Sequence, residues 1–117
     1  MSFEDRLTAI CSPLPGATHA HPSDGELHSW KVGEKMFACM GTHDPGVSVK
    51  TPDAETAAML IDAGVASKAK YFHRTWVRLP ETVAEDELRH RIYSSYDLVR
   101  ASLTKKFQAN LAPRETC

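Results

Sequence analysis

The chain has 117 residues, of which 42% are hydrophobic and 25% are charged, as is typical of one globular domain with a single core. Its 14 basic and 15 acidic side chains give a net charge of −1, so any nucleic-acid binding requires a local basic patch and should be weak and salt-sensitive. No apolar run reaches the length of a membrane span and no signal peptide is recognisable, so we expect no membrane association.

The first predicted elements are a short helix and a polar loop. Ser2 is a suitable helix N-cap, and apolar residues recur after it at helical spacing as far as Cys11. Pro13 and Pro15 end this helix because neither has a backbone N–H to donate. Residues 17–26 include Pro, Ser and Gly, which predicts a loop.

Three strands are predicted next. The segments HSWKV (28–32) and KMFACM (35–40) flank the pair Gly33-Glu34. This arrangement indicates a β-hairpin, and a Gly at the first central position favours a type II′ turn. VSVK (47–50) has its two valines on one face and is predicted to be the third strand.

A helix and a second hairpin are predicted to follow. TPD at 51–53 is a strong helix start with the threonine as N-cap, and Gly64 can end the helix in the left-handed conformation. AKYF (69–72) and TWVRL (75–79) are predicted to pair as strands around a tight tip at 73–74.

The last predicted element is the longest helix. It opens with the acids at 85–87 and closes with Lys105 and Lys106, in accord with the helix dipole. Its apolar stripe consists of Leu88, Ile92, Tyr96, Val99, Leu103 and Phe107. We therefore predict a single domain over 1–107 and a flexible tail over 108–117. The predicted fold is a two-layer α+β domain of order α-β(3)-α-β(2)-α, an antiparallel sheet with its helices on one face.

No catalytic site, metal site or cofactor is predicted. Histidines occur at positions 19, 21, 28 and 43, but their spacing matches no zinc framework. There is no nucleophile elbow and no glycine-rich phosphate loop, so we expect a non-enzymatic protein. Cys11, Cys39 and Cys117 are odd in number and widely spaced, which favours a reducing cytoplasm. Cys11 and Cys39 are predicted to be buried apolar residues.

The stretch KAKYFHRTWVRLP at 68–80 combines cations and aromatic rings without an acid. If Val77 and Leu79 face the core, alternation turns Trp76 and Arg78 outward, where phosphate contact and base stacking are available. The candidate nucleic-acid-binding residues are Lys68, Lys70, Arg74, Trp76 and Arg78, and an extended patch would add Lys31, Lys35 and Lys50. The alternative is that Trp76 covers the edge of the core and the lysines solubilise an edge strand.

Five segments together resemble the MmcQ/YjbR family of small bacterial proteins, which are described as DNA-binding-like. They are LPGAT (14–18), SWKVGEKMFA (29–38), VSVKT (47–51), TWVRL (75–79) and SSYDLVRASLTKK (94–106). The resemblance extends over residues 3–107. It implies a two-layer, double-winged fold similar to that of secretion chaperones, with the same order of helices and strands.

Two interpretations of function follow. The first is a cytoplasmic, non-enzymatic domain of this kind that binds DNA weakly through its basic and aromatic hairpin. The second is a protein-interaction module that docks a protein partner or a second copy on the open sheet face or on the Trp76 hairpin. A contiguous basic patch would favour nucleic acid, and a flat apolar face would favour a protein partner.

Overall fold

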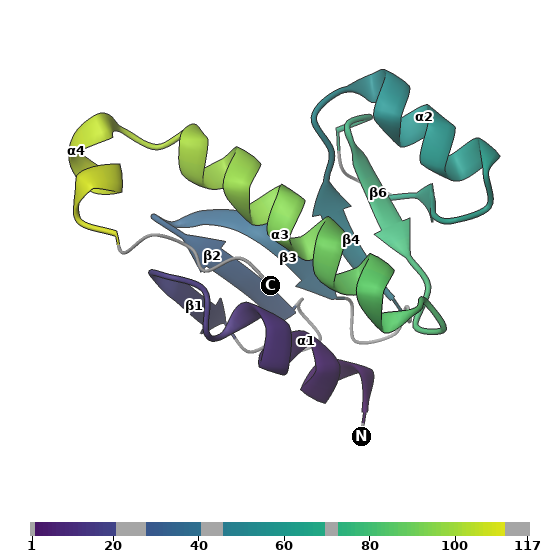
Figure 1. The fold of residues 1–117 in the computed structure, drawn as a ribbon, viewed down its shortest axis with the longest axis horizontal. Helices are drawn as coiled ribbons and strands as arrows, with labels where there is room; N and C mark the ends of the chain where they lie inside the picture. Colours follow the sequence, from purple (N-terminus) through teal and green to yellow (C-terminus); the bar gives the residue numbers. More distant parts are fainter. Residues whose placement is uncertain (1, 21–27, 41–45, 70–72, 112–117) are drawn as a thin grey trace.

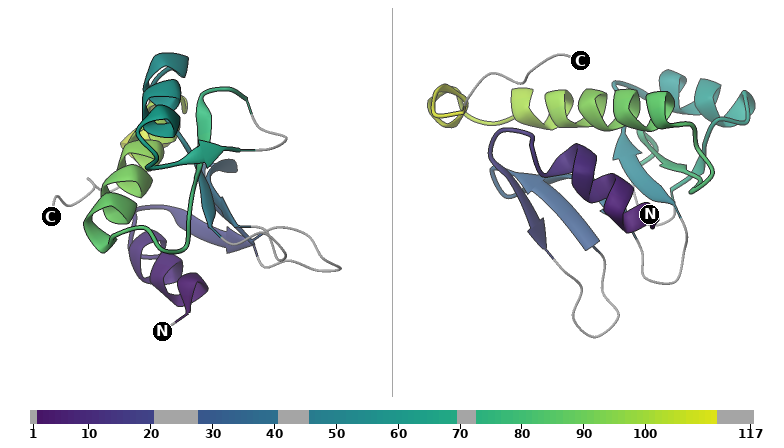
Figure 2. Two further views of the ribbon diagram at one scale, coloured as in Figure 1. Left: turned by 90° about the vertical axis from the view of Figure 1, so that its right-hand side faces the viewer. Right: turned by 60° about the horizontal axis from the view of Figure 1, so that its bottom comes forward.

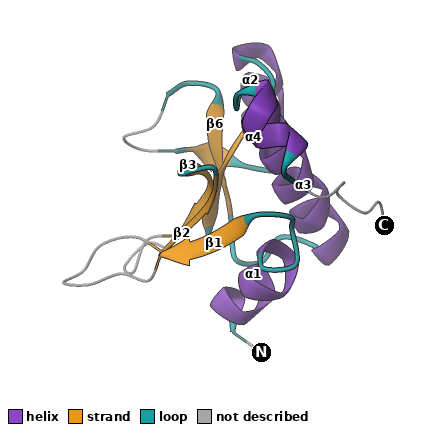
Figure 3. Ribbon diagram, turned by 90° about the vertical axis from the view of Figure 1, so that its left-hand side faces the viewer, coloured by secondary structure: helices purple, strands orange, loops and turns teal. Residues whose placement is uncertain are grey.

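The computed structural model describes residues 2–20, 28–40, 46–69 and 73–111. They form a six-stranded antiparallel sheet in the order β1-β2-β3-β4-β6-β5, and the helices lie on one face of it (Figures 1 and 3). The strands are β1 Ala17–Ala20, β2 His28–Val32, β3 Lys35–Met40, β4 Val47–Lys50, β5 Ser67–Lys68 and β6 Trp76–Leu79. The helices are α1 Phe3–Cys11, α2 Ala54–Asp62, α3 Glu85–Ala101 and α4 Lys105–Ala109. The predicted two-layer α+β architecture is confirmed.

The N-terminal helix forms as predicted, but the loop predicted after it is partly a strand. Ser2 caps α1 with a reciprocal capping box to Asp5. Residues 17–20, expected in a loop, pair with β2 and add a strand to the sheet. Their sequence lacks apolar alternation, but the partly buried His19 ring stacks on the fully buried Trp30 of β2, at 4.3 Å between ring centroids. The rest of the predicted loop lies outside the described residues.

The first hairpin is confirmed, but its turn differs from the predicted type. Gly33 and Glu34 both have positive φ angles, +57° and +67°, as a type I′ turn requires. A Cβ on Gly33 would lie 2.8 Å from Leu103 Cδ2, so the turn packs directly under the end of the helical layer. Both the backbone angle and the space therefore require glycine at position 33.

Helix α2 begins two residues later than predicted. Its N-cap is Asp53, whose carboxylate accepts a 2.7 Å hydrogen bond from the Thr56 N–H. Thr51 instead is buried and donates its hydroxyl to the Thr75 carbonyl at 2.6 Å, which joins the end of β4 to the start of β6. Gly64, with φ +77°, follows the helix as predicted.

The predicted long helix is divided in two. Helix α3 ends at Ala101, and Thr104 caps the short α4 by accepting a hydrogen bond from the Phe107 N–H. Lys105 and Lys106 therefore begin α4 and do not close α3, because the hydroxyl of Thr104 offers a new N-cap. Past the predicted domain end at 107, α4 continues to Ala109 and Leu111 packs against the core.

The apolar stripe of α3 packs on the sheet as predicted over most of its length. Leu88, Ile92, Tyr96 and Val99 are buried, whereas Leu103 is partly buried and Phe107 is exposed. The last two follow the break in the helix and lie over the Gly33 turn. Figure 2 shows α3 running along the sheet, with α1 next to its N-terminal half.

The second hairpin is looser than predicted. Strand β5 is only two residues long, and Ser67 and Lys68 pair with Arg78 and Val77. The predicted strand at 69–72 is wrong at Ala69, which belongs to no strand, and its other residues lie outside the described chain. Strand β6 begins at Trp76, one residue later than predicted, and the described residues 69 and 73–75 belong to no strand.

Candidate nucleic-acid interface

The face of the sheet opposite α3 carries short polar side chains and cations. Residues directly opposite each other on paired strands share a face, and the pairing places Ser29, Cys39, Ser48, Arg78 and Ser67 in one row across five strands. Lys50 and Trp76 form the start of the next row. Val77 and Leu79 are fully buried toward the helices, so the predicted outward direction of Trp76 and Arg78 is confirmed.

Charge is segregated between the two layers of the domain. The charged side chains that the described strands β2, β4 and β6 place on the open face are Lys31, Lys50 and Arg78, and no acid of the described strands accompanies them. The acids of the described chain lie on the helices or in turns: Glu4, Asp5, Glu34, Asp53, Glu55, Asp62, Glu81, Glu85, Asp86, Glu87 and Asp97. Although the whole chain has a net charge of −1, its described strands thus place cations and no acid on the open face.

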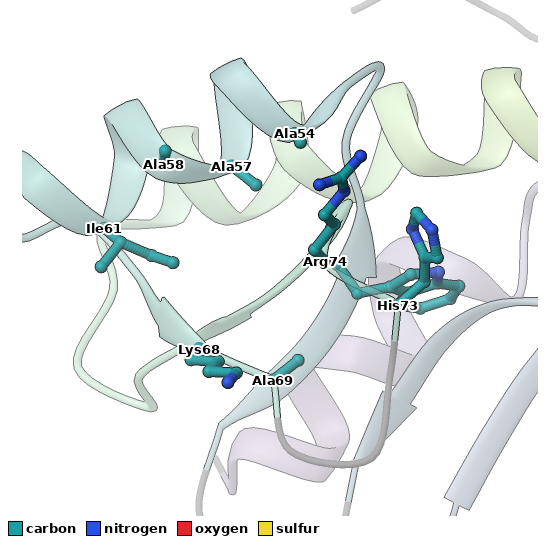
Figure 4. Close-up of a pocket in the computed structure, with 9 residues that line it drawn as sticks. Ala54, Ala57, Ala58, Ile61, Lys68, Ala69, His73 and Arg74 are labelled. Atoms are coloured by element: carbon teal, nitrogen blue, oxygen red, sulfur yellow. The ribbon is translucent and has the colours of Figure 1, made fainter.

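A groove opens between α2 and the described residues next to the end of β5 and the start of β6. It has a volume of about 280 Å³. Its lining residues are Ala54, Ala57, Ala58, Ile61, Lys68, Ala69, His73, Arg74 and Trp76. In Figure 4 the alanines of α2 face Lys68 and Ala69 across the groove, and the Arg74 side chain extends toward the N-terminal end of the helix. The described lining residues therefore combine small apolar side chains, a tryptophan and cations.

The structure brings together three of the five predicted binding residues. Lys68, Arg74 and Trp76 line the groove, and Lys68 and Arg74 are exposed. Arg78 lies on the open sheet face, opposite Ser48 on the neighbouring strand. Lys70 lies outside the described residues.

The predicted extension of the patch is supported for two of its three lysines. Lys31 and Lys50 lie on the open face, but Lys35 does not belong to this surface. Its ammonium group is 3.3 Å from the Ser102 hydroxyl, on the helical side of the sheet. The reason is the bulge in β3 near Trp30 and Lys31, which shifts the register of the first hairpin.

The α2 side of the groove was not predicted from the sequence. Ala54, Ala57 and Ala58 are spaced so that they lie on one side of the helix, and their small size leaves room against the β5–β6 connection. The signal in the sequence is the run of alanines in AETAAMLID. A run of alanines also suits an ordinary helix, so only the structure reveals that this side faces the basic hairpin.

Two of the histidines take part in a hydrogen-bonded chain near the N-terminus. The buried His28 has Nε2 3.2 Å from Glu4 Oε1 and Nδ1 3.1 Å from His19 Nε2. The chain links α1 to β1 and β2, so these histidines have a structural role. In the described part of the protein, no three His, Cys, Asp or Glu side chains are grouped so that they could hold a metal ion. His21 and His43 lie outside that part, and the absence of a metal stays a prediction.

The two described cysteines are buried, as predicted, and neither forms a disulfide. Burial raises the pKa of the Cys39 thiol to about 11 and raises the pKa of Cys11 further. Both are therefore neutral thiols near pH 7, which are poor nucleophiles. Within the residues that the structure describes, no helix has the length and apolar character needed to cross a bilayer.

The sheet order, the one-sided helical layer and the hairpin groove define a small α+β domain with an open, cationic sheet face. Residues 12–98 match the YjbR family model, and the chain belongs to the YjbR family. A crystal structure of a Deinococcus radiodurans protein with the family domain DUF419 is similar, with 27% sequence identity and a TM-score of 0.80. The match covers 93% of this chain and 87% of that one. Among curated proteins, none matches the chain.

Proposed function

We propose that this YjbR-family domain is a non-enzymatic, cytoplasmic protein that binds nucleic acid weakly through the open sheet face and the adjoining groove. The observation that carries the proposal is the segregation of charge. Lys31, Lys50 and Arg78 lie on a face to which the described strands contribute no acid, while the acids of the described chain lie on helices and in turns. Such a face attracts a phosphate backbone even when the whole protein is slightly acidic.

The side chains of this surface have separate tasks. Lysine and arginine neutralise phosphates, which gives affinity and salt dependence without sequence specificity. Ser29 adds a small, partly buried hydroxyl side chain to the same face, and Ser48 is buried there between its neighbours. Trp76 is partly buried at the edge of this surface and supplies a ring for stacking. Each of these roles is a binding contact and none involves a chemical reaction, so the proposal is for binding alone.

The experiment is a salt-titrated binding assay with fluorescently labelled DNA, both single-stranded and duplex. The proposal expects affinity that falls linearly with the logarithm of the salt concentration, with a slope set by the number of phosphates contacted. Absence of binding to either DNA at low salt would refute it.

A protein partner or a second copy is the second candidate. It is favoured by two exposed apolar side chains on α2, Met59 at 59% and Ile61 at 38% exposure. Ile61 also lines the groove, so a partner could cover both features together. Sedimentation analysis of the purified protein distinguishes the self-association form of this candidate, because a monomer over a wide concentration range excludes it.

A further inference from the structure

We infer that the domain associates head to tail with a second copy of itself, with α4 of one copy packed on α2 of the next. The inference specifies the second-copy form of the second candidate function, on which it rests, and it does not depend on DNA binding. It is carried by exposed apolar side chains at the two ends of the helical layer and by the opposite charges that flank them.

Helix α2 presents an acidic surface with an apolar centre. Glu55, Met59 and Asp62 recur at helical spacing, so they lie along one stripe of the helix. All three are exposed, and Met59 is the most exposed large apolar side chain of the described residues, at 59%. The N-cap Asp53 adds a further carboxylate, and residues 51–67 include no Lys, Arg or His. This surface therefore suits an apolar group that carries cations beside it.

Helix α4 presents that complementary combination. Phe107 is 41% exposed and follows directly on Lys105 and Lys106, which are both exposed. The helix contains no acid. The hairpin turn that packs against Phe107 contributes Glu34 and Lys35, whose charges cancel. An aromatic ring flanked by cations thus stands at this end of the helical layer.

The two surfaces cannot meet within one chain. Helices α2 and α4 lie at opposite ends of α3 in each view (Figures 1 and 2). Helix α3 has 17 residues, which at about 1.5 Å per residue makes it roughly 25 Å long. Within the described residues, no ion pair involves the charged side chains that flank the two apolar ones, namely Glu55, Asp62, Lys105 and Lys106. A second copy can bring these groups together.

The two surfaces also fit each other in size. A methionine sulfur packs favourably against an aromatic ring, so Met59 and Phe107 form the apolar centre of the contact. Glu55 and Asp62 lie two helical turns apart, roughly 10 Å along the axis, and each can receive one of the two lysines of α4. Exposed ion pairs contribute little individually and are screened by salt, so the association should be weak and salt-sensitive.

The charges also determine how the copies are arranged. A symmetric contact through α2 alone would oppose acid to acid, and one through α4 alone would oppose base to base. The contact therefore joins different surfaces of the two copies, and each copy keeps one surface open for a further copy. Association of this kind forms rings or open chains and does not stop at a dimer.

Sedimentation of the full chain over a concentration series, in the presence of a reductant, is the first test. We expect the average mass of the parent to rise above the 13.0 kDa of the monomer without levelling off at a dimer, and to fall when salt is added. Glu55→Gln with Asp62→Asn should weaken association by about 2- to 30-fold, the effect of two lost surface ion pairs. Glu81→Gln with Asp86→Asn changes the net charge equally at exposed residues outside α2, and should associate like the parent.

Charge reversal gives a second test. Lys105→Glu/Lys106→Glu makes both surfaces acidic, and Glu55→Lys/Asp62→Lys makes both surfaces basic. Neither variant should associate alone, because like charges then meet, whereas an equimolar mixture of the two should associate. Met59→Ala in both partners keeps every charge and removes the apolar centre, so it should weaken the association of the mixture. A general attraction between proteins of opposite net charge would not respond to Met59→Ala.

The comparison uses variants whose melting temperature matches that of the parent. If the parent stays a monomer at every concentration, the self-association candidate and this inference both fail, while the DNA-binding proposal is unaffected. If the parent associates but stops at a dimer, if the α2 variant without acids associates like the parent, or if the two reversed variants do not associate when mixed, this inference alone is wrong.

Discussion

The Ser95 hydroxyl donates a 2.6 Å hydrogen bond to the backbone carbonyl of Phe37, deep in the core beneath α3. The same oxygen accepts a 2.9 Å hydrogen bond from the backbone N–H of Lys50. The pairing of β3 with β4 joins Ala38 to Val49, so the next pair would be Phe37 and Lys50. A side chain from the helix thus bridges the two backbone groups where the strands separate.

Ser95→Ala should destabilise the domain through this bridge. It leaves a backbone carbonyl and a backbone N–H inside the protein without their common partner, which costs about 1–3 kcal/mol. Chemical denaturation measures the change in the free energy of unfolding. Ser94→Ala, one residue away and only partly buried, is the control and should change stability by less than about 0.5 kcal/mol. Equal stability of Ser95→Ala and the parent would show that the bridge contributes nothing.

Ile92→Ala tests the packing of α3 on the sheet. Ile92 is fully buried, and its truncation leaves a cavity that should cost about 2–5 kcal/mol. Ile61→Ala removes the same atoms from a side chain that is 38% exposed, and its cost should be much smaller. The comparison is made from denaturation curves with equal m-values. A similar loss at both positions would contradict the architecture.

Local sequence patterns predicted most of the helices and strands, because these elements depend mainly on residues that are neighbours along the chain. Alternation around Val77 placed Trp76 on the outer face, and the Gly33-Glu34 turn fixed the first hairpin. The errors arose where tertiary contacts decided the outcome. Residues 17–20 pair with β2 and His19 stacks on Trp30, contacts that no local pattern reveals.

The candidate site, too, was predicted only in part from the sequence. The cations and Trp76 were visible in the sequence as a basic and aromatic stretch. Their alanine counterpart on α2 was not, because the two segments meet only in the folded chain. Ser95 was also missed, since a serine within an amphipathic helix gives no sign of the strand carbonyl that it will contact.

The lowered pKa of Asp53 predicts that this residue contributes to the loss of folding stability at acid pH. Hydrogen bonds from Thr56 hold the pKa of this carboxyl below its usual value. A lowered folded-state pKa adds stability above the unfolded-state pKa of about 4, and that stability is lost as the pH falls below it. Asp53→Asn keeps a capping side chain without a titrating group and should reduce the pH dependence of stability below about pH 4. Asp62→Asn removes a charge at the other end of α2 without removing a cap, and serves as the control. Identical acid profiles of Asp53→Asn and the parent would contradict this role.

The buried thiols should react slowly in the folded protein. With a pKa of about 11, Cys39 has roughly one thiolate in a thousand at pH 8. Cys11 is fully buried and less acidic still. In a Cys117→Ser variant, a thiol reagent such as DTNB should label neither cysteine at once, and both after denaturation. Fast labelling of either thiol in the native protein would show that its site opens readily.

The cations at the hairpin should determine the salt dependence of DNA binding. Each phosphate contact contributes about −0.9 to the slope of log affinity against log salt on duplex DNA, so Arg74→Gln with Arg78→Gln should flatten the slope by roughly two units. Lys105→Gln with Lys106→Gln removes the same charge from α4, in the helical layer, and should leave the slope nearly unchanged. Trp76→Ala should instead weaken single-strand binding by about 1–3 kcal/mol with little change in slope.

These variants are informative only if they fold, because Trp76 and Arg78 both belong to β6. The melting temperature of each variant is therefore compared with that of the parent before binding is measured. If the α4 pair flattens the slope as much as the hairpin pair does, the binding is a general attraction of cations and not a property of the sheet face. If folded Arg74→Gln/Arg78→Gln binds DNA with the slope of the parent, the hairpin is structural and the protein-partner candidate takes precedence.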